Sequence, residues 1–216
     1  MSTGQWIPTP DGEAWHFDAG AESLDFASTG PVGDSPALGE RLHAPGDLGT
    51  WLAERVATLR ADDVTERDLA DALILRGALA RLYTAAADGA SPDADDVDTV
   101  NLFAATPDIP PALPGGRRQA GTGRIRPAQA LSMLARDAIA ALGAPDGRIR
   151  RCAADDCRTV YRDESRTNSR RWCSMQRCGN RAKVRAHRAR VRQTAGVSAD
   201  RPAQAWVTRT SFQNAT

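Results

Sequence analysis

The stretch from residue 152 to residue 178 reads CAADDCRTVYRDESRTNSRRWCSMQRC, and it holds all four cysteines of the chain. Four residues separate the members of each cysteine pair and fifteen separate the pairs, which is typical of two ligand pairs for one metal ion. Four thiolates complete the tetrahedral coordination of Zn²⁺ and leave no open position for a substrate or a reactive water. We therefore expect one structural zinc ion, held by Cys152, Cys157, Cys173 and Cys178, and no metal catalysis.

The redox state of these cysteines depends on the compartment of the protein. The N-terminus shows no basic segment followed by an apolar one, and no run approaches 18 apolar residues. This pattern predicts a cytoplasmic, nucleoid-associated protein that is not embedded in a membrane. Thiols usually stay reduced in the cytoplasm, which favours metal binding. Two disulfides, or four free thiols, are the alternative.

Charge is distributed unevenly along the 216 residues, although the formal net charge is only +1. Residues 1–147 carry 11 basic and 22 acidic side chains, whereas residues 148–193 carry 15 basic and 4 acidic ones. We expect an acidic domain over 1–147, a basic zinc finger over 148–193 and a disordered tail over 194–216. A basic module joined to an acidic one is typical of nucleic-acid-binding proteins.

The acidic domain is predicted to be mostly helical after a short extended start. Four segments carry the apolar spacing of amphipathic helices, over residues 47–59, 65–88, 91–103 and 127–142. Thr65, with Asp68 three residues later, has the spacing of a capping box. Residues 143–147 contain glycine and proline and indicate a linker.

No catalytic set is visible in the acidic domain, because its two histidines are isolated and it has neither a cysteine nor a glycine-rich phosphate loop. We therefore expect that the protein is not an enzyme. Asp25, Phe26 and Arg76 are candidates for the lining of a small-molecule effector pocket. A surface or packing role is the alternative for each of them.

The basic segment is predicted to form a hairpin followed by a helix. Residues 148–152 and 159–162 are expected to pair as two strands that carry the first two cysteines. Ser174 is a suitable helix cap, which places Cys173 just before the cap and Cys178 at the fourth helical position. These two positions face each other across the first turn, so both thiols can reach one ion.

The helix after the cysteines is expected to end near Gln193. A break at Gly179 is the alternative, with Asn180 capping a helix that starts one turn later. Four arginines with helical spacing share one side of this helix: Arg181, Arg185, Arg188 and Arg192. Their mutual repulsion destabilises an isolated helix, and phosphate groups would relieve it.

The cysteine region resembles the CGNR zinc finger, in RRWCSM at residues 170–175 and in CGNR at residues 178–181. The N-terminal half is similar to the ABATE domain, in LDF at residues 24–26, WL at 51–52 and LR at 75–76, with Ser28 where that family favours asparagine. In that family the finger follows an ABATE domain, in proteins described as stress-induced bacterial transcription regulators. The resemblance implies an α+β protein, with a mostly helical N-terminal domain followed by a small zinc-bound hairpin-plus-helix finger that contacts nucleic acid.

The favoured function is zinc-dependent DNA binding in transcription regulation. The acidic domain would form a homodimer, bind an effector, or do both. A finger with four to six phosphate contacts binds weakly at physiological salt, and a dimer would supply two fingers. Two alternatives are an RNA-binding zinc ribbon and a protein-interaction module whose basic finger docks on an acidic partner, such as the chain's own N-terminal half. The candidate nucleic-acid contacts are Arg170, Arg171, Arg177, Asn180, Arg181, Lys183, Arg185, Arg188 and Arg192.

Overall fold

The computed structural model describes residues 3–8, 13–36, 38–56, 59–107, 113 and 125–199, with side chains up to residue 192. The chain divides into two units, Met1–Gly179 and Asn180–Thr216, and each is considered by itself. The predicted tail lies largely outside the described residues. None of the described helices is both long enough and apolar enough to cross a bilayer.

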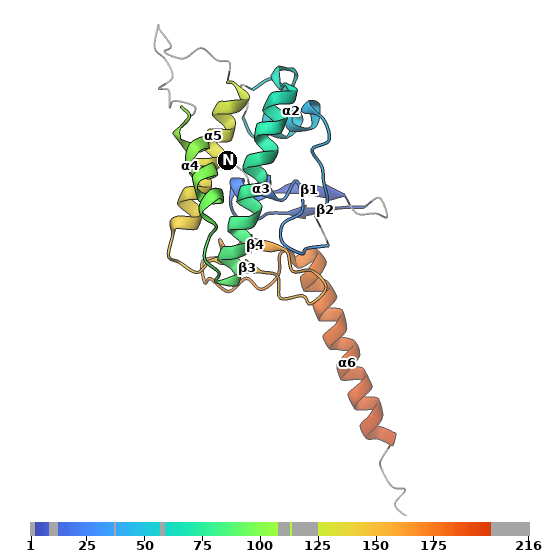
Figure 1. Cartoon of the computed structure of the whole chain (residues 1–216). Helices are drawn as coiled ribbons and strands as arrows, with labels where there is room; N and C mark the ends of the chain where they lie inside the picture. Colours follow the sequence, from blue (N-terminus) through green and yellow to red (C-terminus); the bar gives the residue numbers. More distant parts are fainter. Residues whose placement is uncertain are drawn as a thin grey trace, which may run out of the picture. The chain divides into compact units, whose positions relative to one another are not determined.

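The first unit is mainly helical, as predicted, and its described part contains two short β-hairpins (Figure 1). Its helices are α1 (Glu22–Ala27), α2 (Pro45–Ala53), η1 (Ala61–Asp63), α3 (Glu66–Asp88), α4 (Ala94–Ala105) and α5 (Pro127–Gly143). Its strands are β1 (Gln5–Pro8), β2 (Ala14–Phe17), β3 (Ile149–Arg151) and β4 (Val160–Arg162). The four predicted helical segments correspond to α2, α3, α4 and α5, and their prediction is confirmed.

Helix α3 runs through the centre of this unit and packs against α1, α2, α4, α5 and β3. The predicted capping box begins the helix, because the Thr65 hydroxyl accepts from the Asp68 N–H (3.2 Å) and the Asp68 carboxylate accepts from the Thr65 N–H (2.9 Å). Gly89, in the left-handed region with φ of 66°, ends it. Leu75 and Leu79 are fully buried on its inner face. Local capping and a periodic apolar face thus explain its length.

The first hairpin pairs β1 with β2 in antiparallel register, with Gln5 opposite Phe17. Trp15 and Phe17 are buried in the core, and His16 between them is exposed. This alternation is the period-two pattern of a strand with one buried face.

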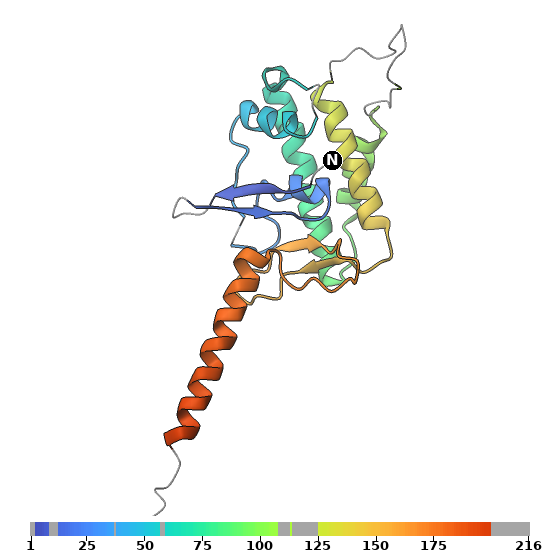
Figure 2. The ribbon, with the colours of Figure 1, turned by 180° about the vertical axis from the view of Figure 1, so that it is seen from behind.

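The second hairpin pairs β3 with β4 and lies beside the C-terminal end of α3 in both views (Figures 1 and 2). The Arg162 N–H donates to the Ala19 carbonyl (2.7 Å), and the hydroxyls of Ser35 and Thr159 are 2.7 Å apart. Gly20, directly after Ala19, adopts a φ of +83°, and a Cβ at this position would overlap the carbonyl oxygen of Arg162. Only glycine fits this close approach. The cysteine hairpin is therefore packed onto the helical part within one unit.

The turn that carries Cys178 differs from the predicted α-helical first turn. Residues Met175–Gly179 (η2) form a π-helical turn, in which the Gly179 N–H donates to the Ser174 carbonyl (3.0 Å) five residues earlier. This wider turn adds one residue to the ring that joins Ser174 to Gly179. π-helical turns occur preferentially at functional sites, here beside two cysteines.

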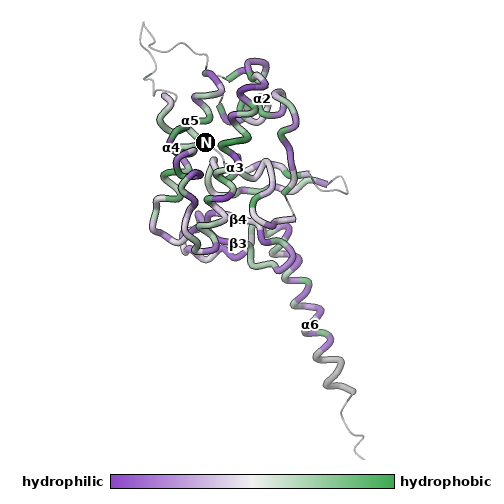
Figure 3. Tube along the Cα trace, in the orientation of Figure 1, coloured by the Kyte–Doolittle hydropathy of each residue, from purple (hydrophilic) through white to green (hydrophobic). Residues whose placement is uncertain are grey.

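The second unit contains α6 (Asn180–Ala199), which begins at Asn180 and ends six residues beyond the predicted end at Gln193. Hydrophilic residues recur along its described part (Figure 3). Side chains from Lys183 to Arg192 are exposed, including Val184 (47%) and Val191 (52%). Among the described residues of α6, the valine side chains are therefore exposed and do not form a buried apolar face.

Candidate zinc centre and nucleic-acid interface

The four cysteines come together as the sequence predicts. Their sulfur atoms all lie within 4.8 Å of one another, and all four side chains are buried. The Cys173 sulfur is 3.5 Å from that of Cys157 and 3.6 Å from that of Cys178. Two thiolates bound to one tetrahedral zinc at about 2.3 Å lie about 3.8 Å apart, whereas the sulfurs of a disulfide lie about 2.05 Å apart. The four cysteines form no disulfide with one another, and their arrangement fits one shared zinc ion.

Local hydrogen bonds help to position the four ligands. The Cys152 N–H donates to the Thr159 carbonyl (2.8 Å), which closes the hairpin behind the first ligand. The Cys173 N–H points at the Cys152 sulfur (3.4 Å), and the Thr159 hydroxyl lies 3.1 Å from the Cys157 sulfur. Hydrogen bonds from Cys152, Cys173 and the fourth thiol lower the pKa of Cys157. These contacts favour the thiolate form of Cys157, whereas hydrogen bonds among the thiols raise the pKa of Cys173 and Cys178.

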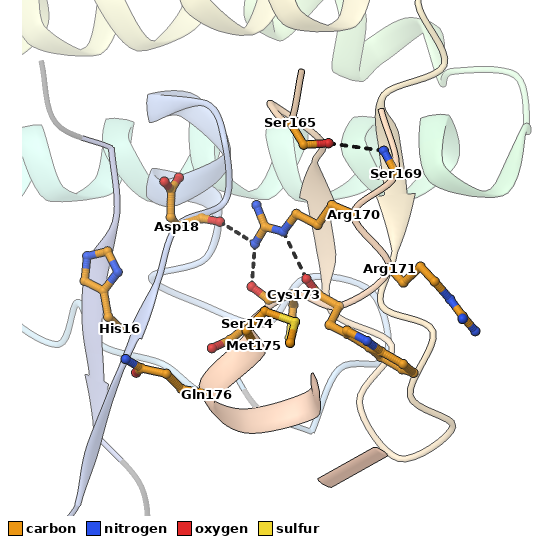
Figure 4. A pocket seen from close by; sticks show the side chains of 11 residues that line it. His16, Asp18, Ser165, Ser169, Arg170, Arg171, Cys173, Ser174, Met175 and Gln176 are labelled. Atoms are coloured by element: carbon orange, nitrogen blue, oxygen red, sulfur yellow. Dashed lines mark hydrogen bonds between the residues drawn. The ribbon is translucent and has the colours of Figure 1, made fainter. Parts of the chain in front are cut away.

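Arg170 links the zinc loop to the end of β2 (Figure 4). Its guanidinium donates to the carbonyls of Trp172 (3.0 Å), Asp18 (2.8 Å) and Cys173, and it lies 4.4 Å from the Tyr161 ring centroid. The Tyr161 hydroxyl in turn donates to the Arg170 carbonyl (2.6 Å). The predicted contact residue Arg170 is thus engaged in shaping the loop around Cys173.

The buried carboxylate of Asp163 holds the other side of this loop. Burial alone would raise its pKa, but hydrogen bonds from Ser165 and the Arg170 N–H, together with the charge of Arg150, hold the pKa below its usual value. The Ser165 and Arg170 N–H groups donate to it at 2.9 and 2.8 Å. An ionised Asp163 therefore anchors the loop that leads to Cys173.

Other hairpin arginines pair with acidic residues of the helical part. The Arg151 guanidinium donates to both carboxylate oxygens of Asp88 (2.5 and 2.6 Å) and to Asp34 (3.0 Å). Arg158 also pairs with Asp34 (2.7 Å). The hydrogen bond from Arg151 lowers the pKa of Asp88. These pairs join residues more than 60 positions apart, so the local sequence carries no signal for them.

The remaining predicted contact residues fall into two groups. Arg171 is exposed, with its guanidinium 5.3 Å from the Trp172 ring, and Arg177 lies 4.8 Å from the Trp15 ring; both belong to the first unit. The other six lie on α6 and are Asn180, Arg181, Lys183, Arg185, Arg188 and Arg192. Arg190 is also exposed on α6, but it was not among the predicted contact residues. Its spacing of seven residues from Lys183 places both side chains on one side of the helix, and this spacing could have identified it.

The three predicted effector residues have separate surroundings. Asp25 is fully buried, and its carboxylate accepts from the N–H groups of Gly4 (2.6 Å) and Ala19 (3.0 Å). Burial raises the pKa of Asp25 to about 7. Phe26 packs on Trp51 in the core.

Arg76, the third of these residues, donates to both oxygens of Glu40 (2.6 and 2.5 Å) near the surface. The hydrogen bond from Arg76 lowers the pKa of Glu40 to about 2. The structure thus accounts for Asp25, Phe26 and Arg76 by packing and pairing, and the effector pocket stays a prediction.

Two family models match the chain. The CGNR zinc finger matches residues 148–191, and ABATE, described as "Putative stress-induced transcription regulator", matches residues 20–145, more than half of the chain. The chain belongs to the ABATE family. As predicted, the CGNR zinc finger follows the ABATE domain, and the four clustered cysteines lie within the finger match. Among curated proteins, none matches this ABATE protein.

Proposed function

We propose that this ABATE protein is a zinc-dependent, DNA-binding transcription regulator whose main contact element is α6. The supporting observation is the separation of charge along the chain. Residues 1–179 carry 20 basic and 26 acidic side chains, whereas residues 180–199 carry six basic and no acidic ones. A helix of this kind attracts phosphate groups without an internal carboxylate to compete for its cations.

Apart from a side that carries alanines, the described side chains of α6 gather on three sides of the helix. Residues three, four and seven apart share a side of an α-helix. One side carries Arg181, Arg185, Arg188 and Arg192, and the opposite side carries Lys183 and Arg190. A flank between them presents Val184, His187 and Val191, all exposed.

This arrangement matches the requirements of a helix in the major groove. Such a helix lies between two phosphate backbones and turns one flank toward the base edges. Cations on opposite sides can meet both backbones. The flank of Val184, His187 and Val191 then faces the bases, where a valine can contact a thymine methyl group and His187 can form a hydrogen bond.

The zinc site contributes architecture and no chemical step. The four cysteine thiolates would hold the ion, which supplies a cross-link between the β3–β4 hairpin and η2. Because Cys178 precedes Asn180 by two residues, this cross-link fixes the residues from which α6 extends. Closed coordination by four sulfurs is typical of structural zinc.

Salt dependence of DNA binding tests the role of α6. The Arg188→Ala/Arg192→Ala double variant removes two cations from one side of the helix. We expect the slope of log affinity against log salt to become shallower by about 1.8, because each phosphate contact contributes about 0.9. Fluorescence anisotropy of a labelled duplex measures the slope.

The matched control is Arg60→Ala/Arg67→Ala, which removes two arginines exposed on the first unit. It should leave the slope unchanged. If both double variants changed the slope equally, general charge rather than α6 would explain the binding. Competition by duplex RNA of the same sequence separates DNA binding from the RNA-binding alternative.

A further inference from the structure

A cavity of about 330 Å³ lies between α3, α4 and α5 within the first unit. These three helices pack against one another in pairs (Figures 1 and 2). Each helix lines the cavity with residues spaced three and four apart, which share one side of a helix. On α3 these residues are Leu82, Ala85 and Ala86, and the corresponding triplets of α4 and α5 begin at Val97 and Ile139. The cavity is therefore a gap where three helical faces meet.

Small side chains on α3 leave this gap open. Ala85 and Ala86 line it at positions where larger apolar side chains would fill the space. Protein interiors contain few voids larger than a water molecule, because the atoms around a void lose van der Waals contacts. In the lining, Leu82 and Val100 are buried, whereas Ile139 is 44% exposed. The cavity thus reaches from the core to the surface, where a ligand can enter.

The lining favours an uncharged ligand. Among the described residues, none that lines the cavity is charged, and Asn101 is the one with a polar side chain. An ion would lose its hydration here without gaining an ion pair, which costs free energy. Exposed Asp95 and Asp98 on α4 disfavour an anion further. The Asn101 side chain is exposed, and an amide can both donate and accept a hydrogen bond.

The cavity also lies next to two connections between the helical part and the cysteine hairpin. Asp88, two residues after Ala86, ends α3 and accepts two hydrogen bonds from Arg151 of β3 (2.5 and 2.6 Å). Gly143, which lines the cavity, ends α5, and β3 begins six residues later. A ligand that contacts both helix ends would therefore act on segments that position the hairpin.

We propose that this cavity binds a neutral, apolar molecule of about two fused rings, and that such a molecule is the effector of the protein. A cavity of about 150 Å³ lined by apolar side chains holds one benzene molecule, so about twice that volume accommodates two fused rings with a small substituent. A hydroxyl substituent can form a hydrogen bond with the Asn101 amide. The effector role rests on the proposed function, whereas ligand binding does not depend on it.

Isothermal titration calorimetry of the zinc-loaded, full-length protein tests the binding. The probes are 1-naphthol and 1-naphthoate, which are similar in size, and only 1-naphthoate is charged at neutral pH. We expect 1-naphthol to bind about tenfold more tightly, because the lining offers no partner for a carboxylate. Equal affinity for the two probes would contradict an uncharged site, and no binding of 1-naphthol would overturn the proposal.

Two variants place the probe in the cavity. Ala86→Leu adds a side chain that fills the space, so it should weaken 1-naphthol binding about tenfold. Asn101→Leu should remove the preference for 1-naphthol over naphthalene, because it removes the partner of the hydroxyl group. The matched control is Ala70→Leu, the same substitution at an exposed alanine of α3 that does not line the cavity.

The control variant should bind 1-naphthol as tightly as wild type. Equal weakening by Ala70→Leu and Ala86→Leu would place the probe outside the cavity and overturn the proposal. Light scattering tests a second copy of the chain as the occupant. A wild-type dimer that does not bind 1-naphthol and that Ala86→Leu converts to a monomer would assign the cavity to the partner copy instead.

DNA titrations with and without saturating 1-naphthol test the effector role. We expect the affinity of wild type for a labelled duplex to change by about fivefold or more, the lower end of typical allosteric couplings. The affinity of Ala86→Leu should not change. Unchanged affinity in wild type would contradict the effector role while the ligand site stood. Protein that binds 1-naphthol but no DNA contradicts the proposed function, and with it the effector role, but not the ligand site.

Discussion

At the scale of single residues, Asp25 is the buried polar group that connects the N-terminal strand to the helical core. Both of its carboxylate oxygens accept backbone N–H groups, from Gly4 and Ala19, and the Gln5 amide donates to its carbonyl (2.6 Å). The sequence identified Asp25 as a candidate pocket residue but did not predict its structural role. That role depends on backbone N–H groups of other segments, for which the sequence carries no signal.

Asp25→Asn should destabilise the protein by about 1–3 kcal/mol. An asparagine offers one acceptor and places an N–H₂ group against a backbone N–H, which leaves a buried donor unsatisfied. Urea unfolding followed by circular dichroism measures the change. An unchanged free energy of unfolding would show that the two backbone bonds contribute nothing.

The pH dependence of stability tests the same group. Burial raises the pKa of Asp25 from 3.8 to about 7, so between these values the folded state retains a proton that the unfolded state releases. The contribution of Asp25 to stability should therefore fall as pH rises from about 4 to about 7 and level off above. The free energy of unfolding of wild type minus that of Asp25→Asn should show this slope; parallel curves would exclude it.

Gly20→Ala should destabilise the junction between the helical part and the cysteine hairpin. The positive φ disfavours any side chain, and the added Cβ meets the Arg162 carbonyl, so a cost of about 1–3 kcal/mol is expected. Gly39→Ala is the control, because a Cβ at Gly39 meets nothing within 4 Å. Equal thermal stability of the two variants would contradict the role of Gly20.

At the scale of elements, local signals predicted α2 to α5 and the β3–β4 hairpin. The Thr65–Asp68 capping box and the apolar spacing of α3 act within a few residues, so they can be read from sequence. The cysteine spacing likewise predicted the ligand set. The π-helical turn of η2 was not predicted, because helix propensity gives no signal for it. The turn occurs where the Cys173 and Cys178 sulfurs lie close together.

Removal of zinc should act first on the elements that the ion joins. In Cys178→Ser, which removes one ligand, we expect amide hydrogen exchange to rise in β3, β4 and η2 and to remain slow in α3, because α3 is held by its own caps and core packing. Mass spectrometry of exchanged peptides measures this. Equal acceleration in α3 would indicate that the zinc site supports the whole unit.

At the scale of the whole molecule, the family boundary near residue 147 does not coincide with a gap in packing. The hairpin contacts the helical part through Arg162–Ala19, Ser35–Thr159 and Arg151–Asp88. These long-range pairs could not be predicted, because each member looks like an ordinary surface residue in sequence. The acidic half thus forms ion pairs with some hairpin arginines, while docking of the whole basic finger on an acidic partner stays a prediction.

Excision of the finger should therefore weaken its zinc site. A fragment of residues 148–193 loses the contacts with α3 and with Ala19, so we expect it to bind zinc less tightly than the full chain. Competition with a colorimetric chelator compares the two affinities. Equal affinity would mean that the hairpin folds independently, as the linker prediction for residues 143–147 implies.

The central claim, that a metal held by four cysteines enables α6 to bind DNA, is tested most directly by one anisotropy titration. A labelled duplex is titrated with zinc-loaded protein, with protein stripped of zinc under reducing conditions, and with stripped protein to which one equivalent of zinc is restored. We expect binding with the first, at least a tenfold weaker affinity with the second and full recovery with the third. Equal affinity in all three titrations would contradict the account.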